Sequence, residues 1–292
     1  MKFFKTGITS LAMVCAMGVG VSQAGTDLNE IAPLLIFPGV VTSGTFLGGV
    51  ETWTTVTNAS NSPWNVHFSY INGEAGLNEC NECNFNVLMT PNDTETLIFV
   101  HAFGNTQIVS LDLNTIMTCP WTMGFVTAAL EDPVTGESVS MNALLGEEVI
   151  VDYTSGSALS VSAVPFQGKD TNDGNRWYAF DDIEYGKLPN VIAADFIAPD
   201  LSGGPISHVG AALTLFTPGF VRNMPPTVDC SVTGHDAFEN TFSTSFKFGC
   251  WTHIALEDIH PEFAFPNLGQ LLFNTHGWLR LACQVDVYGD HR

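Results

Sequence analysis

The feature that most constrains this chain is a series of short segments rich in Val, Thr, Phe, Ile and Trp, separated by turn residues. In residues 65–71, the apolar Val66, Phe68 and Tyr70 alternate with polar side chains, which gives a strand one apolar and one polar face. Segments of this kind recur along the chain, several of them at intervals of about 8–14 residues. They span residues 51–57, 65–71, 94–101, 107–113, 122–130, 149–153, 158–164, 191–197, 208–216, 241–248 and 278–287.

Clusters of Asn, Asp, Ser, Pro and Gly lie between these segments, for example at residues 58–63 and 132–136. Short strands separated by such turn clusters predict an all-β chain. The expected fold is an antiparallel β-sandwich of the Ig-like or jelly-roll-like kind. Little helix is expected. Residues 137–148 fit either a strand pair or a short helix, and residues 256–259 are a second helical candidate.

The first 24 residues have the features of a secretory signal peptide. Lys2 and Lys5 precede a mostly apolar, uncharged run over residues 8–21, and Ser22 and Ala24 are the small residues that a signal peptidase reads. The run is shorter than the ~18–20 residues that a membrane-spanning helix needs. We therefore expect an exported, bacterial-type mature chain, located outside the cell, at its surface or in the periplasm, with no transmembrane segment after signal removal.

Acidic residues dominate the charged side chains. Removal of Lys2 and Lys5 leaves seven Lys and Arg residues against 30 Asp and Glu residues. Such a chain repels phosphate backbones and anionic lipids, so we expect no nucleic acid among its partners. Only 13% of all residues are charged and 45% are hydrophobic, which predicts a folded chain. A surface with so few charged side chains is compatible with self-assembly of the chain.

Six cysteines remain once Cys15 has left with the signal peptide. An even number in an oxidising compartment predicts a disulfide framework. We expect Cys119 to pair with Cys80 or Cys83, and spacing cannot choose among the other pairings. The six residues are Cys80, Cys83, Cys119, Cys230, Cys250 and Cys283.

The Cys80-x-x-Cys83 motif has three alternative interpretations that its surroundings disfavour. Covalent haem attachment needs a histidine where Asn84 stands. A zinc knuckle needs a second pair of ligands at similar spacing. A redox centre opens a helix, whereas residues 85–89 have the composition of a strand. A structural disulfide is therefore the expected role.

A polar stretch at residues 168–174 (GKDTNDG) predicts a domain boundary. We expect an N-terminal β-sandwich domain at 25–168 and a C-terminal β domain at 169–292, each with three cysteines, so that one bridge can cross between them. A single large sandwich is the alternative.

The same stretch supplies a candidate calcium loop. Asp170, Asn172 and Asp173 offer hard oxygen ligands, and Asp182 or Glu184 would close the site. The glycine falls at the fifth position rather than the sixth of an EF-hand, and an Asx-rich turn is the competing interpretation. Calcium is the one cofactor that the sequence suggests.

A second group of ligand-type residues lies in residues 250–262. On a helix, His253, Glu257 and His260 would share one face and could hold a transition metal together with Cys250. A strand over residues 251–256 would scatter them, and a disulfide at Cys250 would remove that ligand.

Signatures of known catalytic machinery are missing from the sequence, which has no nucleophile elbow, H-E-x-x-H or phosphate-binding loop. The sequence therefore favours a non-enzymatic exported protein that serves in binding, adhesion or surface assembly, with a carbohydrate or a surface protein as partner. The alternative is a secreted carbohydrate-active hydrolase or lyase that uses acidic residues 181–184. Six tryptophans are candidates for a sugar-stacking surface. They are Trp53, Trp64, Trp121, Trp177, Trp251 and Trp278.

Overall fold

The computed structural model describes residues 11–12, 30–45, 48–76, 79–110, 116–169, 180, 185, 191–197, 211–217, 227–236, 240–263 and 276–286. Over this part of the chain the regular structure is β, apart from helix α1 (Leu256–Ile259) and a 3₁₀ turn (Pro261–Phe263). Every strand pairing is antiparallel except that between β1 (Leu11–Ala12) and β14. The predicted all-β sandwich is confirmed.

The first half of the chain forms two facing sheets. One has six strands in the order β11-β10-β3-β6-β7-β8, and the other has five in the order β12-β2-β9-β4-β5. The strand bounds are β2 Leu34–Val41, β3 Val50–Asn58, β4 Trp64–Asn72, β5 Glu82–Met89, β6 Thr94–Ala102, β7 Asn105–Ser110, β8 Ile116–Cys119, β9 Met123–Glu131, β10 Leu144–Asp152, β11 Ser157–Ser162 and β12 Val164–Phe166.

Strand β4 shows why the chain folds in this way. Val66, Phe68 and Tyr70 are fully buried in the core between the two sheets. The opposite face is polar at His67 but buried at Ser69 and Ile71, because a further layer covers that end of the strand. The predicted alternation is confirmed, and the second face of the strand is only partly exposed to solvent.

Strand β2 is buried along almost its whole length. Leu35 and Phe37 point into the core between the two sheets, whereas Leu34 and Ile36 point to the layer on the other side. A strand buried on both faces has a continuous apolar sequence rather than an alternating one. The register slips between Phe37 and Val40, where a bulge forms.

The second half of the chain adds two more sheets. Strands β14 (Ala211–Phe216) and β17 (Trp251–Ala255) pair with each other, and β1 lies along β14. The outer sheet has four strands in the order β13-β18-β15-β16. Their bounds are β13 Val191–Ile197, β15 Thr227–Asp236, β16 Thr241–Phe248 and β18 His276–Asp286.

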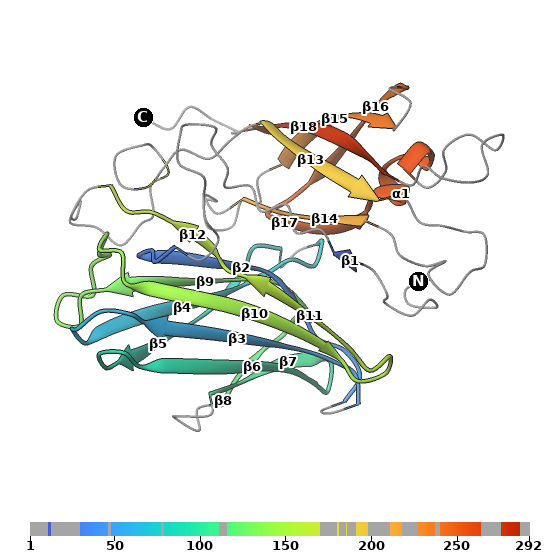
Figure 1. Cartoon of the computed structure of the whole chain (residues 1–292). Coiled ribbons are helices and arrows are strands. Elements are labelled where there is room, and N and C mark those ends of the chain that lie inside the picture. Colours follow the sequence, from blue (N-terminus) through green and yellow to red (C-terminus); the bar gives the residue numbers. More distant parts are fainter. Residues whose placement is uncertain are drawn as a thin grey trace.

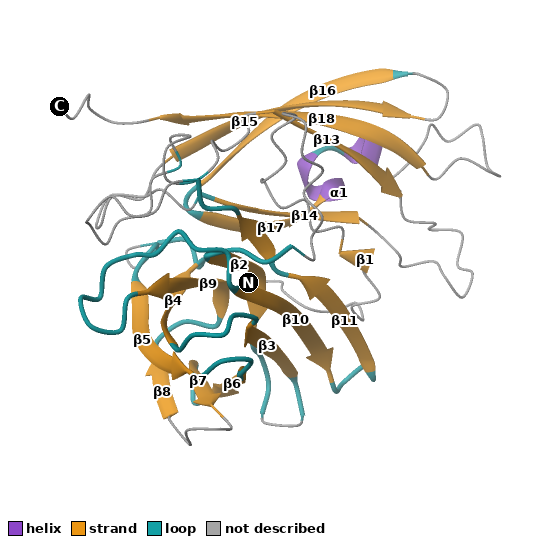
Figure 2. Cartoon of the chain, turned by 60° about the vertical axis from the view of Figure 1, so that its left-hand side comes forward, coloured by secondary structure: helices purple, strands orange, loops and turns teal. Residues whose placement is uncertain are grey.

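Figures 1 and 2 show these sheets stacked in layers, with the six-stranded sheet at one side and the four-stranded sheet at the other. Helix α1 lies between the four-stranded sheet and strand β14 (Figure 2). Three cores fill the spaces between successive layers. The middle core combines residues from both halves of the chain, among them Phe125, Phe216 and Trp251. The boundary at 168/169 stays a prediction. The four-residue α1 is too short to cross a membrane, and no described helix qualifies.

All six cysteines of the predicted framework form disulfides. Cys83 pairs with Cys119, as one of the two expected options, and joins β5 to β8. Cys230 pairs with Cys283 between adjacent strands of the outer sheet. Cys80 pairs with Cys250, 170 residues away, and joins the two halves of the chain covalently.

Candidate functional site

The outer face of the four-stranded sheet carries the strongest candidate for a ligand surface. Along β15 and β18, the apolar residues Val232, Leu279 and Leu281 point inward to the core under the sheet. The residues between them point outward, and hydroxyl side chains such as Ser243 and Ser245 on β16 are exposed. This alternation makes a polar and largely open surface.

An aromatic pair stands at one end of this face. Trp278 and His235 lie opposite each other in the register of β18 and β15. Their rings stack with centroids 4.0 Å apart and an interplanar angle of 12°. The Thr241 hydroxyl lies 3.0 Å from His235 Nδ1 and fixes the imidazole, while Trp278 remains 44% exposed. The indole is therefore held in place and still accessible.

Two cationic side chains lie on the same sheet, Arg280 beside the pair and Lys247 six residues along β16 from Thr241, which is opposite His235. Lys247 forms an ion pair of 2.6 Å with Asp229. Arg280 follows Trp278 by two residues, so both side chains lie on one face, and it makes no ion pair with the described residues. A guanidinium beside an open indole can donate hydrogen bonds to carboxylate or hydroxyl oxygens of a ligand stacked on the ring.

A second polar cluster lies on the outer face of the five-stranded sheet. The Glu131 carboxylate accepts hydrogen bonds from Asn65 at 3.0 Å and Asn86 at 3.2 Å. His67 Nδ1 lies 2.6 Å from Asn86 Oδ1 and 3.5 Å from Glu131 Oε1. These groups come from neighbouring strands β4, β5 and β9 and satisfy one another, so the cluster ties strands together.

Two further groups were not foreseen from the sequence. Glu51 Oε2 accepts hydrogen bonds from Trp53 Nε1 and Tyr153 Oη, each at 3.3 Å. Glu148 is fully buried between the two sheets of the sandwich. The alternating pattern of β10 gives no signal for it, because a carboxylate is not expected on a core-facing position.

The structure does not assemble the proposed transition-metal set. Cys250 is in a disulfide, His253 lies on strand β17 with Nδ1 2.8 Å from the Thr214 hydroxyl, and the His260 ring stacks on Phe242. The strand predicted over residues 251–256 is confirmed for Trp251–Ala255, and helix α1 begins at Leu256.

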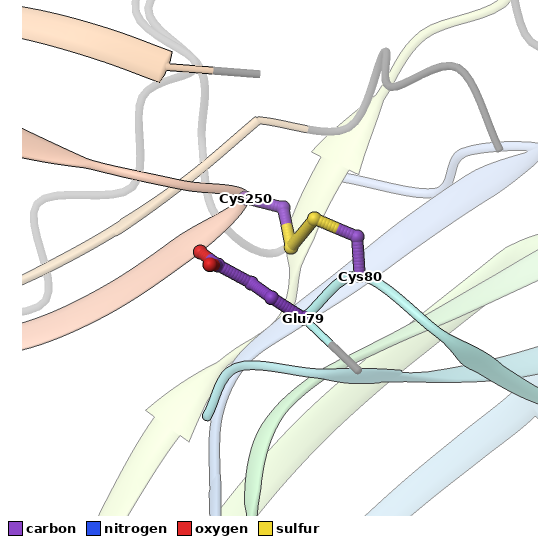
Figure 3. A group of neighbouring side chains, drawn as sticks. All are labelled: Glu79, Cys80 and Cys250. Carbon is purple, nitrogen blue, oxygen red and sulfur yellow. A yellow bond between two sulfur atoms is a disulfide. The ribbon is translucent and has the colours of Figure 1, made fainter. Parts of the chain in front are cut away.

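Figure 3 shows the cluster of metal-type ligands that the described residues do contain, formed by Glu79, Cys80 and Cys250. Its two sulfur atoms are bonded to each other. A disulfide supplies no thiolate, which is the form of cysteine that binds a metal. Glu79 alone is then left as a ligand, so this cluster is a covalent link between layers.

The candidate calcium ligands Asp170, Asn172, Asp173, Asp182 and Glu184 lie outside the described residues. Trp177 does as well. Of the other tryptophans, Trp121 and Trp251 are buried, and Trp278 is the most exposed.

No protein-family model, no curated protein and no solved structure matches this chain.

Proposed function

We propose that this chain is an exported, non-enzymatic binding protein whose ligand surface is the outer face of the four-stranded sheet, and that its ligand is a carbohydrate chain. The observation that carries the proposal is the open, stacked indole of Trp278. Large aromatic side chains are usually buried, so an exposed one that its neighbours hold rigidly marks an interaction surface.

The surroundings of Trp278 suit a sugar better than an apolar ligand. A pyranose ring has one face of C–H groups, which packs on an indole, and a rim of hydroxyl groups, which needs hydrogen-bond partners. Arg280 supplies donors, and Thr241, Ser243 and Ser245 supply hydroxyl groups on the same face. Because Thr241, Ser243 and Ser245 are exposed in a row along β16, the face suits a chain of sugars lying across it.

Export is supported by two features. The leader over residues 1–24 has the composition of a signal peptide. The three disulfides persist in oxidising compartments. The proposal therefore places the protein outside the cytoplasm, where polysaccharides are accessible.

Affinity electrophoresis in gels that contain a neutral glucan, a chitin-type polymer or a polyuronate tests the proposal. We expect at least one polymer to retard the mature protein, Trp278→Ala to abolish the retardation, and Leu88→Ala, which changes an exposed residue of the sandwich, to leave it intact. Retardation that survives Trp278→Ala, or none with any polymer, would refute the site.

The alternative function, a carbohydrate hydrolase or lyase, depends on acidic residues 181–184. The same polymers decide between the two. Release of reducing ends or unsaturated products by the purified protein would show an enzyme, whereas binding without turnover supports the binding protein.

A further inference from the structure

Arg280 is an exposed cation without a carboxylate partner in a strongly acidic chain. The predicted mature chain has 30 acidic residues and seven basic ones, so a basic side chain has many carboxylates available to it. Lys247, on the same sheet, is paired in this way, since its Nζ lies 2.6 Å from Asp229 Oδ1. Arg280 is exposed and makes no ion pair with the described residues. Its guanidinium therefore keeps its hydrogen-bond donors open to a ligand.

The surroundings of Arg280 differ in charge from the chain as a whole. Its neighbours in the strand register are uncharged, Thr233 on β15 and Ala193 on β13. Among the outward side chains that the structure describes on this sheet, Asp229 is the one carboxylate, and it lies four residues along β15 from Thr233, roughly 13 Å away. Exposed charges more than about 8 Å apart are largely screened at physiological ionic strength. A ligand close to Arg280 therefore meets a local positive charge rather than the net negative charge of the chain.

Arg280 and the open indole of Trp278 are spaced to contact one and the same sugar unit. The two residues are two apart on β18, so they lie on one face with their Cα atoms roughly 7 Å apart. A pyranose ring packed on the indole carries its exocyclic carbon at the rim of the ring. A carboxylate at that carbon comes within reach of the long arginine side chain. The planar guanidinium binds a carboxylate through two parallel hydrogen bonds.

We propose that the ligand of this face is a polyuronate, and that Arg280 selects the carboxylate of the sugar unit stacked on Trp278. The inference rests on the proposed function, because it names the ligand class of the same surface. A neutral sugar offers the guanidinium only hydroxyl acceptors, whereas a uronate adds a charge-assisted pair. Thr233 and Ser243 lie in the same register row as Arg280 and supply hydroxyl groups for the rest of the sugar unit.

Isothermal titration calorimetry of the mature protein with polygalacturonate, its methyl ester and polymannuronate tests the proposal. The acid and its ester share their ring, linkage and hydroxyl groups and differ in the carboxylate charge. EDTA in every titration keeps divalent cations from bridging the acidic polymer to the acidic protein. We expect a polyuronate to bind, and its acid form to bind about tenfold more tightly than the ester.

Arg280→Gln should weaken binding of the acid form about tenfold and leave binding of the ester unchanged, so that the preference disappears. Lys247→Gln is the matched control, because it removes the same charge from the same sheet, but from a side chain that Asp229 already pairs. Lys247 is four residues along β16 from Ser243, roughly 13 Å from the register row of Arg280. We expect this variant to keep the affinity of the parent within about twofold.

Four outcomes would overturn the uronate specificity. The first is an ester that binds as tightly as the acid, and the second is an equal loss in Arg280→Gln and Lys247→Gln, which would show diffuse attraction. The third is Arg280-dependent binding of dextran sulfate that is tighter than that of either polyuronate, which would assign the face to a sulfated polymer. The fourth is Trp278-dependent binding of a neutral glucan or a chitin-type polymer with neither polyuronate bound. In that case the proposed function stands and this inference fails, whereas both fail if no polymer binds.

Discussion

Trp251 Nε1 donates a hydrogen bond of 2.7 Å to the carbonyl of Pro38, which lies 213 residues earlier in the chain. The indole also lies so close to Gly73 that a Cβ there would approach the ring to 2.4 Å. Pro38 stands at the bulge of β2, and Trp251 follows Cys250, the cysteine bonded to Cys80. A disulfide, a hydrogen bond and a glycine contact therefore join the two halves at one point.

Trp251→Phe should lower the free energy of unfolding by about 1–3 kcal/mol beyond its packing loss, because the buried Pro38 carbonyl would lose its donor. Trp121→Phe is the matched control. Trp121 is also buried, but its Nε1 has no hydrogen-bond partner among the described residues. Urea denaturation of both variants measures the difference, and equal losses would argue against a stabilising role for the Pro38 bond.

Glu148 should make the protein less stable as pH rises. Burial raises the pKa of Glu148 to about 8, and the Gly39 N–H, which donates to Oε2 at 3.4 Å, offsets this only in part. Oε1 has no partner among the described residues. Between the unfolded pKa, 4.5, and about 8, the folded chain binds a proton that the unfolded chain releases. Unfolding free energy therefore falls by up to about 1.4 kcal/mol per pH unit across this window.

Glu148→Gln should remove this component, so that its stability changes less between pH 5 and about 8 than that of the parent. The neighbouring Glu147 is exposed, and Glu147→Gln should keep the parent's dependence. Thermal melts of the three proteins at several pH values make the comparison. Parallel curves for parent and Glu148→Gln would contradict the proton linkage.

The two bridges that involve the Cys80-x-x-Cys83 motif should contribute unequally. Cys80–Cys250 closes a loop of 170 residues and Cys83–Cys119 one of 36. In the chain-entropy account, the longer loop stabilises by about 1.4 kcal/mol more. Denaturant titration of the two double-alanine variants tests the order, and a larger loss for the Cys83–Cys119 pair would show that strain or local packing outweighs loop entropy.

A thiol assay in denaturant without reductant should find no free thiol in the mature protein, if the leader is removed as proposed. Six of the seven cysteines are in disulfides, and Cys15 lies in the predicted leader. One thiol per chain would show that the leader is retained, and more than one would contradict the disulfide framework. Intact-mass analysis confirms the cleavage position.

Short apolar-rich and alternating segments were enough to predict strands such as β4 and β13, and the helical candidate at residues 256–259, between a strand and Pro261, is α1. Strand β2 was missed because burial on both faces removes the alternation, and Pro38-Gly39 at its bulge resembles a turn. Strand β15, with its mixed polar and apolar composition, gave too weak a signal.

The candidate site was only partly predictable. Trp278 was one of six tryptophans, and nothing in the sequence distinguishes it from the buried Trp251, because exposure depends on which layer lies outermost. The Cys83–Cys119 pair was one of the two pairings that the sequence predicted for Cys119. The Cys80–Cys250 pair was not, since it depends on how the layers stack.

The Cys80–Cys250 disulfide is difficult to form while the chain is being made. Under the proposed export, the chain emerges N-terminus first into an oxidising compartment, where Cys80 encounters Cys83 and Cys119 before Cys250. Early oxidation therefore favours bridges that later have to be exchanged by thiolate attack. Correct maturation should depend on a disulfide isomerase or a redox buffer, and a host that supplies only an oxidant should accumulate chains that lack the Cys80–Cys250 disulfide.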